Sequence, residues 1–298
     1  MNLQSHDFKV QEVDFFSKGL RIHGRYFKAE GPSRGNFLLL HGLTSNSAWF
    51  GNVAQNLAEQ GYNVLIYDRR GSGQSAGIRG DVPGKDAFFW DMKAATDYIW
   101  SQSLQPLHIM AFSYSWKLPP IFIKKLEKES KKVASLIFVA PASDLKTDLQ
   151  PKLSDKLKVF LNWKGPYFDS PVKDTDLTQE KETLKWIRHQ SESRPQLRFT
   201  RRFLMTSNSL DQEASSLLSE IEKPMLVLVP KDDKVIDQEK VRERFSQGPL
   251  GITRQVLDVD GGHLMDNPEA QAELINRVLK WVAKPFTLNA MKPTSTLH

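Results

Sequence analysis

Short apolar runs alternate with longer amphipathic stretches along most of this 298-residue chain. The run Leu38-Leu39-Leu40 is typical: it has the length and composition of a strand that is covered on both faces. Strands are predicted at 9–16, 20–27, 36–40, 62–67, 107–111, 133–140, 225–229 and 253–259. Helices are predicted from the spacing of apolar residues at 49–60, 85–101, 238–245 and 268–282. This alternation predicts an α/β fold with a doubly wound, mostly parallel sheet.

Composition narrows the function classes. Hydrophobic residues make up 40% of the chain, enough for a sizeable core, and the absence of cysteine excludes disulfides, thiolate metal sites and a cysteine nucleophile. The net charge is +6, but lysine and arginine are scattered among acidic residues as on an ordinary solvated surface. No nucleic-acid partner is therefore expected, while a lipid surface stays open. No run reaches the ~18 apolar residues of a membrane span, and the first residues lack a secretory signal, so we expect a cytoplasmic protein.

The segment 143–218 interrupts the alternation. It shows no strand pattern, and its aromatic-bearing stretches are predicted to be helical at 153–163, 183–189 and 197–205. An insertion between two sheet strands must cap the carboxyl edge of the sheet, so we expect a helical lid over a substrate pocket; the alternative is a decoration that only covers the core. The predicted organisation is a core of 1–142 and 219–283, a lid of 143–218 and a flexible tail of 284–298.

Ser113 directly follows a predicted strand, within the pattern A-x-S-x-S. A serine hydroxyl becomes a nucleophile only beside a base and a source of charge stabilisation. A sharp strand-to-helix turn that exposes it needs small residues two before and two after, and Ala111 and Ser115 meet that need. Trp116, however, stands where another small residue is common, and Pro119-Pro120 falls in the following helix. The helix is therefore expected to begin late, near Pro119, or to be kinked.

Two further segments supply the partners of such a serine. His263 follows the last predicted strand through Asp260-Gly261-Gly262, and its imidazole could take the serine proton. Asp233, just after the strand at 225–229, could orient that imidazole. The other candidates are Asp232 or, more weakly, Asp237 and Asp260 for the acid, and His41 for the base.

The loops around the serine are given separate roles. The oxyanion of an acyl-transfer intermediate needs two backbone N–H donors, expected at Leu43 after His41-Gly42 and at Tyr114 after the serine. The stretch 68–75, Asp-Arg-Arg-Gly-Ser-Gly-Gln-Ser, lacks the phosphate-loop pattern. It is expected to be a tight turn that carries buried hydrogen bonds.

With these residues in place, the chain resembles the α/β-hydrolase superfamily over about 20–282. The resemblance is nearest to monoacylglycerol lipases, lysophospholipases and small carboxylesterases. It rests on the Ser113, Asp233 and His263 order and three shared segments: His41-Gly42-Leu43, the 68–75 turn and the Ala140-Pro141-Ala142 exit into a lid. It implies the α/β-hydrolase fold with an inserted helical lid, a Ser113–Asp233–His263 triad, and Leu43 and Tyr114 as oxyanion donors. The A-x-S-x-S elbow is similar to that of the acyl-protein thioesterases of bacterial bioluminescence.

The leading hypothesis is a serine hydrolase that cleaves an acylglycerol, a lysophospholipid or a small ester through an acyl-enzyme. One alternative is an acyl thioesterase or acyl-transferase that acts on acyl-carrier thioesters. Another is a catalytically weak homologue that binds a ligand or partner in the same pocket. We expect the acyl chain to lie against Trp163, Phe168 and Trp186, with no cofactor and no metal, and we expect the unusual elbow to slow turnover of generic short esters.

Overall fold

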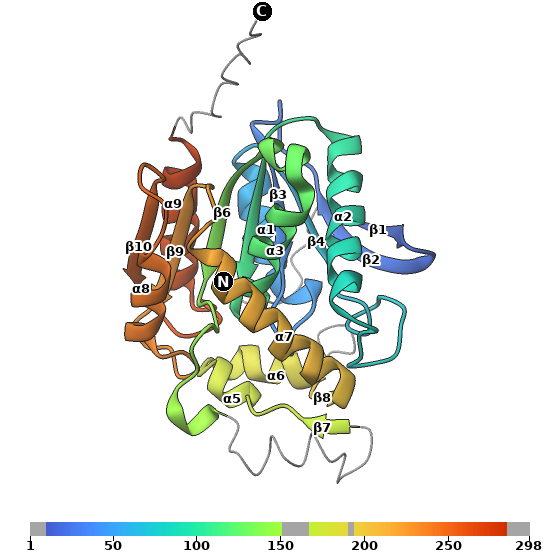
Figure 1. Cartoon of the computed structure of the whole chain (residues 1–298), viewed down its shortest axis with the longest axis vertical. Helices are drawn as coiled ribbons and strands as arrows, with labels where there is room; N and C mark the ends of the chain where they lie inside the picture. Colours follow the sequence, from blue (N-terminus) through green and yellow to red (C-terminus); the bar gives the residue numbers. More distant parts are fainter. Residues whose placement is uncertain (1–9, 151–166, 190–193, 285–298) are drawn as a thin grey trace, which may run out of the picture.

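The computed structural model describes residues 10–150, 167–189 and 194–284 (Figure 1). Its centre is an eight-stranded sheet in the order β1-β2-β4-β3-β5-β6-β9-β10. These strands are β1 (Val10–Ser17), β2 (Leu20–Phe27), β3 (Gly35–Leu40), β4 (Tyr62–Tyr67), β5 (Leu107–Phe112), β6 (Val133–Val139), β9 (Met225–Pro230) and β10 (Arg254–Val259). The β1–β2 and β2–β4 pairs are antiparallel, and every pair from β4 to β10 is parallel. The predicted mostly parallel α/β sheet is confirmed.

Helices cover both faces of this sheet. They are α1 (Gly51–Glu59), α2 (Lys85–Gln102), α3 (Leu118–Leu126), α8 (Gln238–Ser246) and α9 (Pro268–Val282). The chain steps one way from β3 to β4 and the other way from β4 through β5 to β6. Because such crossovers are right-handed, α1 lies on one face and α2 and α3 lie on the other. Helix α9 contacts α1 and so shares its face. Among the described helices, none is long and apolar enough to cross a membrane.

The central strands are buried along their whole length. Every residue of β3, β4, β5, β6 and β9 is buried, which explains why they appear in the sequence as continuous apolar runs rather than alternating ones. Their predicted ends are correct to within one residue. The helix predicted at 49–60 is in fact a 3₁₀ turn, η1 (Ser47–Phe50), followed by α1.

The inserted segment differs from its prediction in two ways. It contains a two-stranded antiparallel sheet, β7 (Tyr167–Asp169) with β8 (Arg198–Thr200), so the expectation that it holds no strand is wrong. The helix predicted at 197–205 begins only at Arg201, as α7 (Arg201–Leu218), with the Thr200 hydroxyl as its N-cap. Strands of three residues are too short to show a period of two in the sequence.

The remaining elements of the insertion are η4 (Thr147–Leu149), α5 (Asp174–Leu177) and α6 (Lys181–His189), the last of which matches the prediction at 183–189. The helix predicted at 153–163 lies outside the described residues, and so does the predicted tail apart from Lys284. Figure 1 shows the described insertion elements gathered at one end of the sheet.

An ionic cluster around a buried histidine lies in the β1–β2 hairpin. His23 is 6% exposed, and its ring nitrogens lie 2.6 Å from Glu12 and 3.3 Å from Asp14. Burial disfavours its charged form, but the hydrogen bonds that His23 donates to Glu12 and Asp14 and the negative charges of Asp68 and Glu12 outweigh that effect and raise the pKa of His23. The hydrogen bond with His23 lowers the pKa of Glu12. The pair is therefore charged in the folded protein at mildly acidic pH.

We expect this pair to make stability pH-dependent in a defined direction. Because the pKa of His23 is raised by folding, its contribution is complete below the ordinary value of 6.5 and is lost as the pH rises through the folded-state pKa. The free energy of unfolding lost in His23→Gln should therefore be largest near about pH 5.5 and smaller near about pH 8.5. Urea titrations across this range measure it. In a Glu12→Gln background the pH dependence of the His23→Gln difference should become clearly smaller, because the hydrogen bond to Glu12 is the largest interaction that raises this pKa. An unchanged dependence there would contradict the assignment.

Candidate active site

Ser113 lies at a strained turn between β5 and the 3₁₀ helix η2 (Ser113–Lys117). Its φ is +50°, in the left-handed region that a residue with a side chain rarely adopts. The turn is held from outside, because the Ala142 amide donates to the Ser113 carbonyl at 3.2 Å. Gly42 faces the serine so closely that an added Cβ would lie 3.5 Å from the Ser113 Cβ. The strained turn directs the hydroxyl into a cavity.

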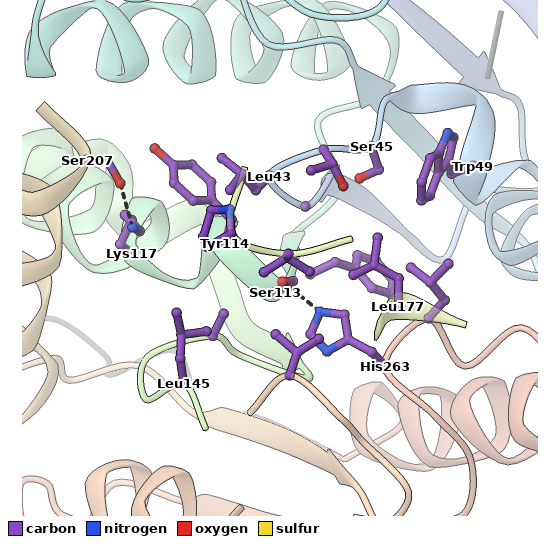
Figure 2. A pocket seen from close by; sticks show the side chains of 18 of the residues that line it. Leu43, Ser45, Trp49, Ser113, Tyr114, Lys117, Leu145, Leu177, Ser207 and His263 are labelled. Atoms are coloured by element: carbon purple, nitrogen blue, oxygen red, sulfur yellow. Dashed lines mark hydrogen bonds between the residues drawn. The ribbon is translucent and has the colours of Figure 1, made fainter. Parts of the chain in front are cut away.

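The structure brings Ser113, His263 and Asp233 together in one chain of hydrogen bonds. Figure 2 shows the first of these bonds, between Ser113 and His263. The Ser113 Oγ lies 2.8 Å from His263 Nε2, and His263 Nδ1 lies 2.7 Å from Asp233 Oδ2. Both partners are nearly inaccessible, His263 at 3% and Asp233 at 1%. With the carboxylate accepting from Nδ1–H, the lone pair of Nε2 faces the serine hydroxyl and can accept its proton.

The carboxyl group of Asp233 is fixed on its other side. Its Oδ1 accepts the backbone N–H groups of Val235 at 2.7 Å and Ile236 at 3.1 Å, so only Oδ2 is turned to the histidine. These bonds stabilise the ionised carboxylate and set its plane.

The three alternative acids have other roles. Asp232 is exposed. Asp260 is exposed and pairs with Lys231 at 2.6 Å. Asp237 is the N-cap of α8, where its side chain accepts from the Lys240 amide. None of the three reaches the imidazole of His263 in the contacts that the structure describes.

His41 is held by Arg69, and none of its hydrogen bonds in the described structure is to the Ser113 hydroxyl. The Arg69 amide donates to His41 Nε2 at 3.0 Å, so Nδ1 carries the proton and lies 2.9 Å from the Gly42 carbonyl. Burial and the positive charge of Arg69 lower the pKa of His41 well below its ordinary value. His41 is thus a neutral structural residue, which removes it as the competing base.

Arg69 also orients the loop that carries Leu43. Its guanidinium donates to three successive carbonyls, those of His41 and Gly42 at 2.8 Å and that of Leu43 at 2.7 Å. In a trans peptide the N–H points opposite to the carbonyl. Because the Gly42 carbonyl is turned to Arg69, the Leu43 N–H faces away from Arg69.

Both expected oxyanion donors border the cavity at Ser113. Leu43 lines the cavity wall, as does Tyr114. Tyr114 is in the first turn of η2, where amides have no acceptor within the helix. The Ser115 hydroxyl, which donates to the His41 carbonyl at 2.6 Å, links the elbow to this loop.

The 68–75 segment is the tight turn that was predicted. Asp68 accepts the amides of Ser47 and Gln74, both at 2.7 Å, and its carbonyl accepts from the Ser75 hydroxyl at 2.6 Å. Gly73 has a φ of +49°, and a Cβ there would lie 2.1 Å from the Asp68 carboxyl group. The turn presents Arg69 to the loop of His41, Gly42 and Leu43. The role of this arginine is not visible in the sequence, because only the conformation of the turn shows where its side chain goes.

The cavity wall is mostly apolar. Its aromatic and larger aliphatic lining residues are Leu43, Trp49, Phe50, Phe112, Tyr114, Leu145, Val172, Leu177, Phe203, Leu204, Val235 and Leu264. The lining from the described part of the chain includes neither Phe168 nor Trp186, which corrects the expectation for these two side chains. Trp186 packs into the core instead, and Phe168 lies on β7. Trp163 lies outside the described residues. The aromatic character of a side chain alone does not show which surface it contacts.

The helix after the elbow begins late, as predicted. The chain runs through η2 and enters α3 at Leu118, so Pro119 and Pro120 occupy the first turn of the helix. Their missing N–H groups cost nothing there, because first-turn amides have no intrahelical acceptor. Trp116 fits as well: it is fully buried, with its ring edge-on to Phe245 at 6.0 Å between centroids.

Replacing Trp116 by a small residue should therefore destabilise the protein rather than repair its elbow. Trp116→Ala is expected to lower the free energy of unfolding by about 3–5 kcal/mol, because it removes a large buried side chain and leaves a cavity. Chemical denaturation measures this loss. The matched control is Trp90→Ala, since Trp90 is 39% exposed on α2 and should lose far less. Similar losses in both variants would show that Trp116 is not a packing residue.

Comparison with known proteins gives the same assignment of fold. A soluble variant of monoglyceride lipase from Saccharomyces cerevisiae, solved with a substrate analogue, superposes with a TM-score of 0.76 at 16% identity, covering 95% of this chain and 97% of that one. A monoacylglycerol lipase from Paleococcus ferrophilus gives a TM-score of 0.73 at 19% identity, over 88% of this chain and 98% of that one. The chain is also 20% identical to a probable lysophospholipase L2 of Haemophilus influenzae over 264 residues, 84% of each protein.

The fold is that of the α/β-hydrolases, an eight-stranded mixed sheet with helices on both faces. Residues 31–264 match the model of one hydrolase family, described as serine aminopeptidase, S33. The chain belongs to this hydrolase family.

Proposed function

We propose that the protein is a serine hydrolase that cleaves carboxylic esters of mainly apolar acyl groups. The observation that carries this proposal is the hydrogen-bonded chain Ser113–His263–Asp233, with Ser113 opening on an apolar cavity. A buried imidazole that accepts a proton from a strained serine is the arrangement that acyl transfer requires.

The reaction follows from the positions of these groups. Ser113 Oγ attacks the ester carbonyl carbon while His263 Nε2 takes its proton, and the oxyanion forms between the Leu43 and Tyr114 amides. His263 then gives the proton to the leaving alcohol, and the C–O bond breaks to leave an acyl-serine. Water, deprotonated by the same imidazole, then attacks the acyl carbon. The bond to Ser113 Oγ breaks, the imidazolium returns its proton to Oγ, and the acid is released. Asp233 stays ionised and holds the imidazolium.

The cavity wall favours an ester over a peptide with a free amino terminus. An aminopeptidase needs a carboxylate to bind the substrate ammonium group. Among the lining residues that the structure describes, the single carboxylate is Asp211, and it is already paired with Lys117 at 2.6 Å. The relatives named as lysophospholipase and monoglyceride lipase add weight to a lipid-like ester.

We further propose that the inserted segment 143–218 serves as the lid. It contributes much of the apolar wall opposite the elbow: Leu145, Pro171, Val172, Leu177, Phe203 and Leu204 all line the cavity. A segment that supplies this much of the wall controls which acyl groups fit.

The experiment is labelling with a fluorophosphonate followed by substrate comparison. The proposal predicts one labelled residue, Ser113, found by peptide mass spectrometry. It also predicts turnover of p-nitrophenyl acyl esters in preference to acyl-CoA and to aminoacyl p-nitroanilides. A preference for acyl-CoA would support the thioesterase alternative that the A-x-S-x-S elbow raises. Absence of labelling would support a binding protein without catalytic activity.

A further inference from the structure

A buried lysine stands in the cavity wall, one turn beyond the proposed nucleophile. The side chain of Lys117 is 4% exposed, and its ammonium lies 2.6 Å from Asp211 and 3.1 Å from the Ser207 hydroxyl. It also lies 4.1 Å from the ring centroid of Tyr114. All four of these residues line the cavity. The proposed ester chemistry uses the backbone of Tyr114 but none of these side chains.

The cluster lies on the acyl side of Ser113. His263 must reach the leaving-group oxygen to protonate it, so the alcohol lies on the side of His263, next to Leu177. The acyl chain must then extend the other way. Figure 2 shows Lys117 and Ser207 on the side of Ser113 that is opposite His263 and Leu177.

Both cationic side chains beside Tyr114 already have partners. Lys117 is paired with Asp211, and Arg69, whose guanidinium carbon lies 5.0 Å from the centroid of the Tyr114 ring, donates to three backbone carbonyls. An anionic acyl group would have to displace Asp211. An uncharged hydroxyl would not, because it can accept from the ammonium and donate to the carboxylate or to Ser207.

One buried hydroxyl here is only weakly engaged. The Tyr114 side chain is 6% exposed, and its hydroxyl interacts with Ser207 without reaching full hydrogen-bond geometry to any group in the described part of the chain. A buried polar group of this kind can complete its hydrogen bonding with a ligand or a water molecule. Lys117, Ser207, Asp211 and Tyr114 together present a donor, an acceptor and two hydroxyls in an otherwise apolar wall.

We propose that this cluster is a subsite for a hydroxyl group on the acyl chain, so that the enzyme prefers hydroxylated acyl esters over plain alkyl ones. The assignment rests on the proposed ester hydrolysis. The preference is expected to be about ten-fold in kcat/KM, the worth of one hydrogen bond to a charged group. It is not larger, because Lys117 and Asp211 satisfy each other when the hydroxyl is missing and leave no orphan charge.

The test compares two p-nitrophenyl esters, hexanoate and ω-hydroxyhexanoate, in wild type, Lys117→Met and Ser207→Ala. Methionine keeps the length of the side chain and removes its charge, and Asp211, 41% exposed, stays solvated. Wild type should prefer the hydroxylated ester. Lys117→Met should abolish that preference by raising kcat/KM for hexanoate and lowering it for the hydroxy ester. Ser207→Ala should reduce the preference several-fold and carries the test if Lys117→Met does not fold. Lys124→Met, an exposed lysine on α3, is the matched control and should behave as wild type.

A purely structural ion pair would give another pattern. If Lys117 only ties α7 to the elbow, its replacement should lower the melting temperature and scale both esters down together, with their ratio unchanged. That result, or equal kcat/KM for the two esters in wild type, would overturn the subsite. Absence of all ester turnover and of fluorophosphonate labelling would overturn the proposed function, and the subsite with it.

Discussion

Replacing Ser113 by alanine is expected to lower ester turnover by about 10⁶, the loss that follows removal of the nucleophile in a serine protease. The reason is geometric: the Ser113 Oγ is the hydroxyl that His263 Nε2 meets at 2.8 Å. Alanine is strained at a φ of +50° just as serine is, so the substitution should not relieve the strain in the turn or change its stability much. Initial rates with a p-nitrophenyl ester give the size of the loss, and circular dichroism shows whether the fold is kept.

Ser115→Ala is the matched control, because it removes a hydroxyl from the same turn. Ser115 is fully buried and donates to the His41 carbonyl at 2.6 Å, which Arg69 also holds at 2.8 Å. Its loss should loosen the oxyanion loop and cost far less turnover than Ser113→Ala. A fatal Ser115→Ala together with an active Ser113→Ala would show that the nucleophile has been misassigned.

Asp233→Asn should be the next most damaging single change, with a loss of about 10⁴ in turnover. The amide oxygen of asparagine can keep the bonds from the Val235 and Ile236 amides, which places its NH₂ group against His263 Nδ1. The imidazole must then carry its proton on Nε2, and that nitrogen can no longer accept the serine proton. The fold is preserved in this account, so kcat should fall while the free energy of unfolding changes little.

Asp232→Asn provides the comparison within the same loop. Asp232 is exposed, so its replacement should leave turnover close to that of wild type. Combining Ser113→Ala with Asp233→Asn should be no worse than Ser113→Ala alone, since residues that act as one unit lose their effect together. Equal, mild effects of the two aspartate changes would rule out the proposed triad.

Residues far apart in the sequence were predicted to meet at this site because each of them follows the carboxyl end of a strand in the same sheet. Ser113, Asp233 and His263 each follow a strand of a parallel sheet, and the carboxyl ends of such strands meet at one edge. That argument needs only the ends of the strands and the types of the residues that follow them, and the sequence shows both. The offset after the strand favoured Asp233 over Asp232, but only the structure shows that the Asp233 side chain meets His263, because a difference of one residue in a loop changes which side chain points inward.

The cavity was harder to predict. Phe168 and Trp186 were expected at its wall, whereas Trp49, Phe50 and Phe112 from the core line it. The insertion is punctuated by short strands and turns, and there neither a helical nor a strand period indicates which face is turned inward. Arg69 and Lys117 were not predicted at all. Charged residues are expected at the surface, and the sequence does not show which of them are buried beside a partner.

The sequence by itself determined the class of fold, the ends of the central strands and the order of the polar residues that follow them. It did so because fully covered strands require unbroken apolar runs of strand length, a local constraint that each segment meets alone. The tertiary structure decided what lies around Ser113: the three carbonyls that Arg69 binds, the buried hydroxyl of Tyr114, and the pairing of Lys117 with Asp211, 94 positions further along the chain. These contacts join side chains from elements distant in sequence, and their energies depend on burial and on the direction of each group, which exist only once the chain has folded.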